Sequence, residues 1–98
     1  MNALLEEQEA NQIKVYSSSY TGTGAFGESS PNTIILTFEP KFVFLLKEGQ
    51  STGLIWGGSP TLGNIHFSAT SNSLTWYSDS AEEQYNVSGT KYYYTIIG

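Results

Sequence analysis

Apolar and polar residues alternate with a period of two along most of the chain after residue 12, which is typical of strands with one buried face. In residues 33–38, for example, Ile34, Leu36 and Phe38 share one face, and the opposite face is mostly polar. The segment is rich in β-branched residues, which also favours a strand. The alternation predicts strands at residues 13–16, 33–38, 42–47, 53–56, 65–68, 74–78 and 91–97.

Short clusters of turn-forming residues separate these segments. Residues 57–60 are Gly-Gly-Ser-Pro, and Pro40 ends a predicted strand because proline has no N–H for the ladder. Short strands between such turns predict an antiparallel sandwich or barrel. A chain of 98 residues holds one domain at most. We therefore expect an all-β fold, a small antiparallel β-sandwich over residues 12–98.

Two predicted strands carry bulky residues on both faces. In residues 42–46, Phe42 and Phe44 point one way, while Val43 and Leu45 point the other. The last predicted strand shows the same pattern with tyrosines and isoleucines. A strand that is apolar on both faces is covered on both faces, and a small domain rarely has enough layers to do so. We therefore expect an oligomer in which a neighbouring subunit supplies the second cover.

The first eleven residues differ in character from the rest of the chain. They contain good helix formers, no glycine or proline, and the acidic residues Glu6, Glu7 and Glu9. The segment is too short to be stable as an isolated helix. Residues 1–11 are expected to form either a disordered tail or the end of a helical stalk that partner chains hold in place.

Composition excludes several classes of protein. The chain has four lysines, no arginine and nine acidic residues, so its formal charge is −5, and we expect no nucleic-acid partner. It has no cysteine, so neither disulfides nor thiolate metal sites are expected. The longest apolar run, residues 42–46, is far shorter than the roughly 20 residues of a membrane-spanning helix. No membrane insertion and no secretory signal are predicted.

One short motif suggests a nucleotide-binding loop. Gly22, Gly24 and Gly27 match the spacing G-x-G-x-x-G, which has that meaning only between a strand and a helix. Ser29, Ser30, Pro31 and Asn32 follow shortly afterwards, and these turn formers lead into a predicted strand. We therefore interpret the glycines as a turn between two strands.

Residues for catalysis are scarce. His66 is the single histidine, it lies within a predicted strand, and no serine occurs in a G-x-S-x-G motif. Asp79, Glu82 and Glu83 could supply a carboxylate pair or Ca²⁺ ligands, although a solvated acidic loop is the commoner explanation. We expect no enzymatic activity, no metal site and no cofactor.

Aromatic residues are the strongest functional signal, with seven tyrosines, five phenylalanines and two tryptophans. Saccharide rings present C–H faces that stack on aromatic rings, and Tyr and Trp combine such a ring with a polar tip. Trp76 and Tyr77 are adjacent on a predicted strand and therefore point to opposite faces, with Trp76 expected to be buried. The expected ligand-binding residues are Trp56, His66, Tyr77 and Asp79.

Three motifs follow one another along the chain: a Tyr-x-Gly-x-Gly turn, a strand that runs into Phe-x-Pro-Lys-x-Val, and a terminal Asn-x-x-Gly-x-x-Tyr-x-Tyr strand. They comprise Tyr20, Gly22, Gly24, Phe38, Pro40, Lys41, Val43, Asn86, Gly89, Tyr92 and Tyr94. This order resembles the C-terminal domains of bacteriophage tail-fibre and receptor-binding proteins, which commonly carry these motifs. The resemblance covers residues 12–98. A weaker likeness, of architecture more than of motif, is to the small six-stranded sandwich of the trimeric H-type lectins.

The resemblance implies a homotrimeric domain at the tip of a tail fibre, made in the host cytoplasm and carried on the virion. Its expected function is adhesion to a host cell-surface saccharide, beside other segments of the fibre. The alternative is a structural domain that trimerises or caps a fibre without a ligand of its own.

Overall fold

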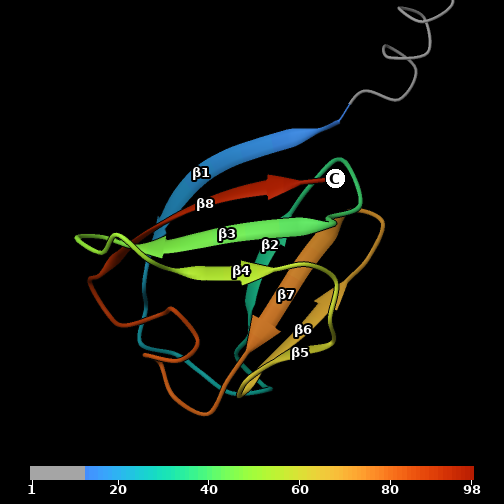
Figure 1. The fold of residues 1–98 in the computed structure, drawn as a ribbon. Helices are drawn as coiled ribbons and strands as arrows, with labels where there is room; N and C mark the ends of the chain where they lie inside the picture. Colours follow the sequence, from blue (N-terminus) through green and yellow to red (C-terminus); the bar gives the residue numbers. More distant parts are fainter. Residues whose placement is uncertain (1–12) are drawn as a thin grey trace, which may run out of the picture.

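Two antiparallel four-stranded sheets make up the part of the chain that the structure, a computed structural model, describes, which is residues 13–98 (Figure 1). The first sheet has the strand order β1-β8-β3-β4, and the second has the order β2-β7-β6-β5. The strands are β1 (Val15–Thr21), β2 (Asn32–Ile35), β3 (Phe42–Lys47), β4 (Leu54–Trp56), β5 (Thr61–Leu62), β6 (Ile65–Ala69), β7 (Ser73–Tyr77) and β8 (Lys91–Ile97).

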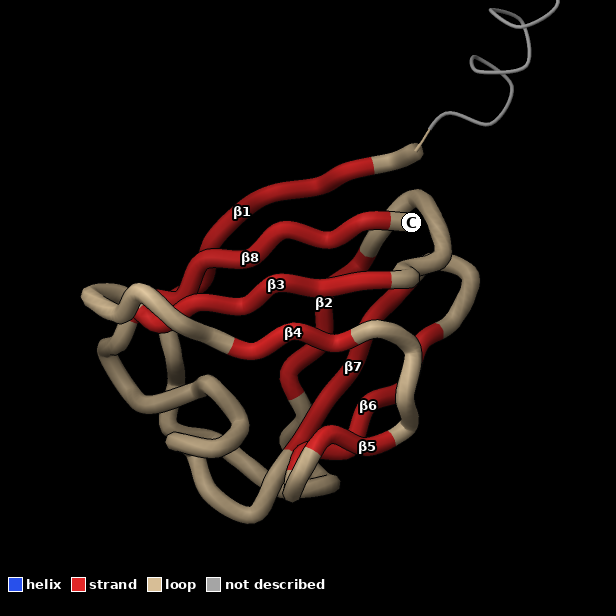
Figure 2. The backbone as a smooth tube through the Cα atoms, in the orientation of Figure 1, coloured by secondary structure: helices blue, strands red, loops and turns tan. Residues whose placement is uncertain are grey.

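The connections between strands in residues 13–98 are loops and turns, as Figure 2 shows. The predicted all-β antiparallel fold is therefore confirmed. The helical or disordered segment predicted for residues 1–11 lies outside the described residues. Within the described part of the chain, no helix has the length and apolarity that crossing a membrane would require.

The inner faces of the two sheets form one hydrophobic core. Ile34, Leu36 and Phe38 are buried, as their alternation predicts, and Trp76 is only 1% exposed. Burial of each such large apolar side chain contributes roughly 1.5–3 kcal/mol. The core therefore holds the two sheets together through contacts that the period-two pattern specifies.

The edge strands differ from the sequence prediction. The first strand was expected at residues 13–16, but β1 extends to Thr21 and pairs with β8 along its whole length, from Val15–Ile97 to Thr21–Lys91. The serines in its middle have weak strand propensity, and pairing with β8 overrides it. β2 is shorter than expected and ends at Ile35, and β5 was not predicted because it has only two residues.

A buried glutamine joins the loops at one end of the sandwich. The Gln84 side chain is fully buried, and its Oε1 accepts hydrogen bonds from the backbone N–H groups of Gly27 and Ser78, both at 2.9 Å. Its Nε2 donates to the carbonyl oxygen of Ser30 at 2.9 Å and to Asn32 Oδ1 at 3.1 Å. All polar atoms of this side chain are therefore satisfied, as burial requires.

The glycine motif has a structural role. A Cβ at Gly22 would overlap the carbonyl oxygen of Val87, so only glycine allows this close approach of the two backbones. Gly24 and Gly27 have φ values of 87° and 94°, which favour glycine. Asn86 holds the loop from the other side, since its Oδ1 accepts a hydrogen bond from the N–H of Thr23 at 3.0 Å.

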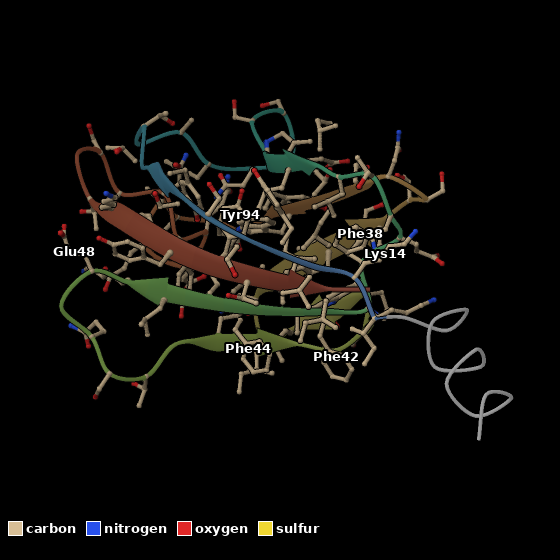
Figure 3. All side chains as sticks on the ribbon, turned by 90° about the horizontal axis from the view of Figure 1, so that it is seen from above. Lys14, Phe38, Phe42, Phe44, Glu48 and Tyr94 are labelled. Atoms are coloured by element: carbon tan, nitrogen blue, oxygen red, sulfur yellow. The ribbon has the colours of Figure 1, made fainter. Side chains whose placement is uncertain are left out.

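The outer faces of the two sheets differ in polarity. The outer face of the first sheet carries Phe42, Phe44, Ile55 and Tyr93, and all four are exposed. Figure 3 shows Phe42 and Phe44 on the side of β3 away from the second sheet, and Tyr94 between the sheets. The outer face of the second sheet carries mainly hydroxyl side chains, with His66 and Tyr77 among them.

Candidate functional site

The two sheets leave a hollow open between their edge strands β1 and β2, which we call the groove. Its volume is about 520 Å³, within the range of roughly 300–1,000 Å³ for small-molecule sites. Three tyrosines, Tyr16, Tyr20 and Tyr94, line it together with threonine and asparagine side chains. None of the described residues that line it is charged.

The alternation of β1 directs the tyrosines into the groove. Tyr16, Ser18 and Tyr20 lie opposite the buried β8 residues, so they face the second sheet. The rings of Tyr16 and Tyr94 lie 6.0 Å apart, and Tyr20 also lies 6.1 Å from Tyr94. Ser18 pairs with Tyr94 between the two β1 tyrosines. The segment Tyr-Ser-Ser-Ser-Tyr and Tyr94 thus build an aromatic wall.

Hydrogen bonds fix the inner end of this wall. The Tyr20 hydroxyl donates to the carbonyl oxygen of Tyr85 at 2.7 Å and accepts from Asn32 Nδ2 at 3.3 Å. Burial raises the pKa of Tyr20 far above its usual range, and it also raises the pKa values of Tyr85 and Tyr94. These phenols therefore stay neutral at ordinary pH.

Hydroxyl and amide groups lie around the rim of the groove. Thr21 and Thr33 are exposed there, and the Thr33 hydroxyl lies 3.4 Å from that of Thr75 on β7. Asn86 donates through Nδ2 to Thr23 Oγ1 at 2.9 Å and so orients that side chain. The groove combines flat aromatic faces with oriented hydroxyl groups and no formal charge, an arrangement that suits a neutral ligand rich in hydroxyl groups.

Two of the residues predicted from the sequence lie together elsewhere on the surface. His66 on β6 and Tyr77 on β7 pair directly on the outer face of the second sheet. Their ring centroids lie 4.8 Å apart, and their planes differ by 14°. A hollow of about 400 Å³ runs beside them. Asp79 is exposed, two positions beyond Tyr77 along the chain.

Trp56 lies in the core, and it also lines a hollow beside residues 57–60, so its predicted contact with a ligand remains a prediction. Its side chain is 3% exposed, and its ring stacks on that of Phe67 at 5.4 Å. Its Nε1 donates to the carbonyl oxygen of Ser59 at 2.6 Å. The alternation contained the necessary signal, since Leu54 and Trp56 share a strand face and both are buried. Trp56 was predicted to contact a ligand because it lies next to the glycine-rich loop at residues 57–60.

The sequence interpretation did not identify the groove tyrosines as ligand contacts. From the sequence, Tyr20 and Tyr94 were identified only as positions of the phage-fibre motifs, and Tyr16 only as the end of the strand predicted at residues 13–16. Two tyrosines four positions apart on one strand face were the signal that could have identified the wall. The contribution of Tyr94 depends on the pairing of β1 with β8, which the sequence does not show.

The acidic loop makes local hydrogen bonds. The Ser78 hydroxyl lies 2.7 Å from the carbonyl oxygen of Asn64 and 3.0 Å from Glu83 Oε2, and its single proton is shared between these two acceptors. Across residues 13–98, no cluster of three or more His, Asp or Glu side chains is arranged to hold a metal ion. Comparisons of the chain with protein-family models, curated proteins and solved structures found no match.

Proposed function

We propose that this chain is the receptor-binding tip of a bacteriophage tail fibre and that it adheres to a neutral saccharide on the host surface. The observation that carries the proposal is the uncharged groove with its wall of three tyrosines. C–H faces of a sugar ring pack on such aromatic faces, and the sugar hydroxyl groups exchange hydrogen bonds with the rim threonines. The groove binds this ligand without chemical change, and the domain is carried on the virion.

Five of the motif positions that suggest a phage fibre lie together at one end of this groove, namely Tyr20, Gly22, Gly24, Asn86 and Gly89. The backbone N–H of Gly89 donates to the carbonyl oxygen of Gly22 at 3.0 Å, and that of Gly24 donates to the carbonyl oxygen of Asn86 at 2.7 Å. Tyr20 is the first residue of the same motif and lines the groove. These residues of the motifs therefore lie against the wall of the proposed binding site, which supports the proposal that the groove is the binding site of a fibre tip.

Charge supports a neutral ligand over an anionic one. The chain has a formal charge of −5 and no arginine, the residue best suited to binding carboxylate or phosphate groups in a bidentate manner. A sialylated or uronate-rich glycan would approach against this charge. Binding of a neutral saccharide would instead depend little on salt concentration.

A second candidate function rests on the outer face of the first sheet. Phe42, Phe44, Ile55 and Tyr93 form an exposed apolar patch, which we call the outer apolar face. Among residues 13–98, no acidic residue of the paired strands projects from this face, so these strands of two copies can approach each other without carboxylate repulsion. Apolar patches of this kind mark interaction sites. We propose that this face joins the subunits of a homotrimer. A purely structural fibre domain would need only this face and would not use the groove to bind a ligand.

Glycan-array binding distinguishes the two functions. The assay compares the unmodified protein with Tyr16→Ala in the groove and with Tyr93→Ala on the outer apolar face. The two tyrosines are a matched pair because they are 44% and 43% exposed. A receptor-binding tip gives a signal on neutral glycans that Tyr16→Ala reduces more than Tyr93→Ala does, since a change at the trimer contact lowers only avidity. A stable assembly with no signal on any glycan would reject adhesion and favour the structural function.

A further inference from the structure

We propose that the binding site extends from the groove across the second sheet, and that its ligand is a linear neutral oligosaccharide and not a single sugar unit. This inference rests on the proposed function, because it assigns a second subsite to the same ligand. The subsite is a row of four side chains, Pro31, Tyr77, His66 and Thr61, which we call the ring row.

Strand pairing places these four residues in a line. His66 pairs with Tyr77 on one side and with Thr61 on the other. Asn32 pairs with Trp76, so the preceding residue, Pro31, falls beside Tyr77 when the antiparallel register is continued. With neighbouring strands about 4.8 Å apart, the row is about 14 Å long. A single sugar ring would cover only part of that length.

The ring row is continuous with the groove. Pro31 lines the groove, and it also lines the hollow beside His66 and Tyr77. That hollow has a volume of about 400 Å³ and includes all four residues of the row. The contact between the hydroxyl groups of Thr33 and Thr75 links the rim of the groove to the next strand of the same sheet. A chain molecule that leaves the groove at Pro31 therefore meets the row directly, in a hollow that Glu28 also lines.

The orientation of the rings suits sugar rings placed along the row. The His66 and Tyr77 centroids are 4.8 Å apart, the spacing of neighbouring strands, and the ring planes are nearly parallel. The two rings are therefore stacked on each other. A sugar unit laid along the row would contact the outward edges of these rings and the pyrrolidine ring of Pro31.

The test compares ligands of increasing length. The probes are taken from the neutral glycan with the strongest array signal: its monosaccharide unit and a tetrasaccharide of the same composition. Titration calorimetry measures the affinity of each. We expect the unmodified protein to bind the tetrasaccharide at least about tenfold more tightly than the monosaccharide. Tyr77→Ala and His66→Ala should remove this advantage and leave monosaccharide affinity unchanged. Tyr16→Ala should weaken binding of both ligands, and Tyr93→Ala should affect neither.

The outcomes separate this inference from the proposed function. Equal affinity for the two lengths, or a Tyr77→Ala protein that retains the tetrasaccharide advantage, would overturn the ring row while adhesion in the groove stands. Loss of affinity for both ligands in Tyr77→Ala would also overturn it, because the residue would then act on the first sugar unit. Absence of binding to any neutral saccharide would reject the proposed function and the extended site together.

Discussion

The hydroxyl of Tyr20 donates a 2.7 Å hydrogen bond to the backbone carbonyl oxygen of Tyr85, 65 residues further along the chain. The bond ties β1, the edge strand of the first sheet, to the loop that follows β7 in the second. Tyr85 has a positive φ of 59°, uncommon for a residue with a side chain. The tyrosine wall of the groove is therefore anchored to a loop that the buried side chain of Gln84 also fixes.

Tyr20→Phe tests this anchor. The substitution keeps the ring contacts and removes the hydroxyl that donates to Tyr85 and accepts from Asn32. We expect the free energy of unfolding to fall by about 1–3 kcal/mol, because partly buried polar groups lose their partner. Urea unfolding followed by tyrosine and tryptophan fluorescence measures the change. A free energy of unfolding equal to that of the unmodified protein would show that the bond does not anchor the wall.

Gln84→Ala tests the buried network at the same end of the sandwich. It removes the acceptor of two backbone N–H groups and the donor to the carbonyl oxygen of Ser30. We expect the free energy of unfolding to fall by at least about 3 kcal/mol, since several buried polar groups lose their partners together. Gln50→Ala, in the exposed turn between β3 and β4, is the matched control and should change stability by less than about 0.5 kcal/mol. Similar losses for the two variants would contradict the network.

Alkaline pH should weaken the fold through the buried tyrosines. Burial raises the pKa of Tyr20 above its value of 10.0 in an unfolded chain, so the folded state holds the phenolic proton more tightly. The contribution of this proton to the free energy of unfolding is fully present below pH 10. It is lost as the pH rises above 10, because the unfolded chain then releases the proton while the folded chain still holds it. The free energy of unfolding, measured with urea between pH 7 and 11, should decline less steeply with pH in Tyr20→Phe than in the unmodified protein. An identical decline in the two proteins would exclude Tyr20 as its source.

Phe44→Glu tests the proposed assembly. Phe44 is 44% exposed at the middle of the outer apolar face, so a carboxylate there leaves the fold intact and opposes contact between copies. Light scattering should give about three chain masses for the unmodified protein and one, 10.7 kDa, for the variant. Ile35→Glu is the control, because Ile35 is also exposed but lies on the second sheet. A single-chain mass for the unmodified protein would reject the trimer.

The sequence predicted the core more fully than the site. Period-two alternation identified the buried face of residues 33–38 and the buried position of Trp76, because one dry sheet face requires that pattern. It also identified the segment of β3 that is apolar on both faces, of which Phe42 and Phe44 are exposed. These properties depend on residues close together in the chain, so local patterns suffice to predict them.

The groove depends on contacts between distant residues, which local patterns do not reveal. Tyr16 and Tyr94 become neighbours only through the pairing of β1 with β8. His66 and Tyr77 were both chosen from the sequence, but their stacking follows from the register of β6 and β7. Trp56 was predicted to contact a ligand because of its glycine-rich neighbours, whereas its stacking partner Phe67 lies on the opposite sheet. The proposed function and the trimer remain predictions.

Hydrogen exchange with and without the neutral glycan identified on the array tests the central claim most directly. Bound saccharide should slow exchange of the amides of β1 and β2 around Tyr16, Tyr20 and Asn32, because it covers the groove between these two edge strands. The amides of β3 and β4 around Phe44 and Ile55 should be unchanged. Protection confined to β3 and β4, or no protection anywhere, would contradict the groove as the saccharide site.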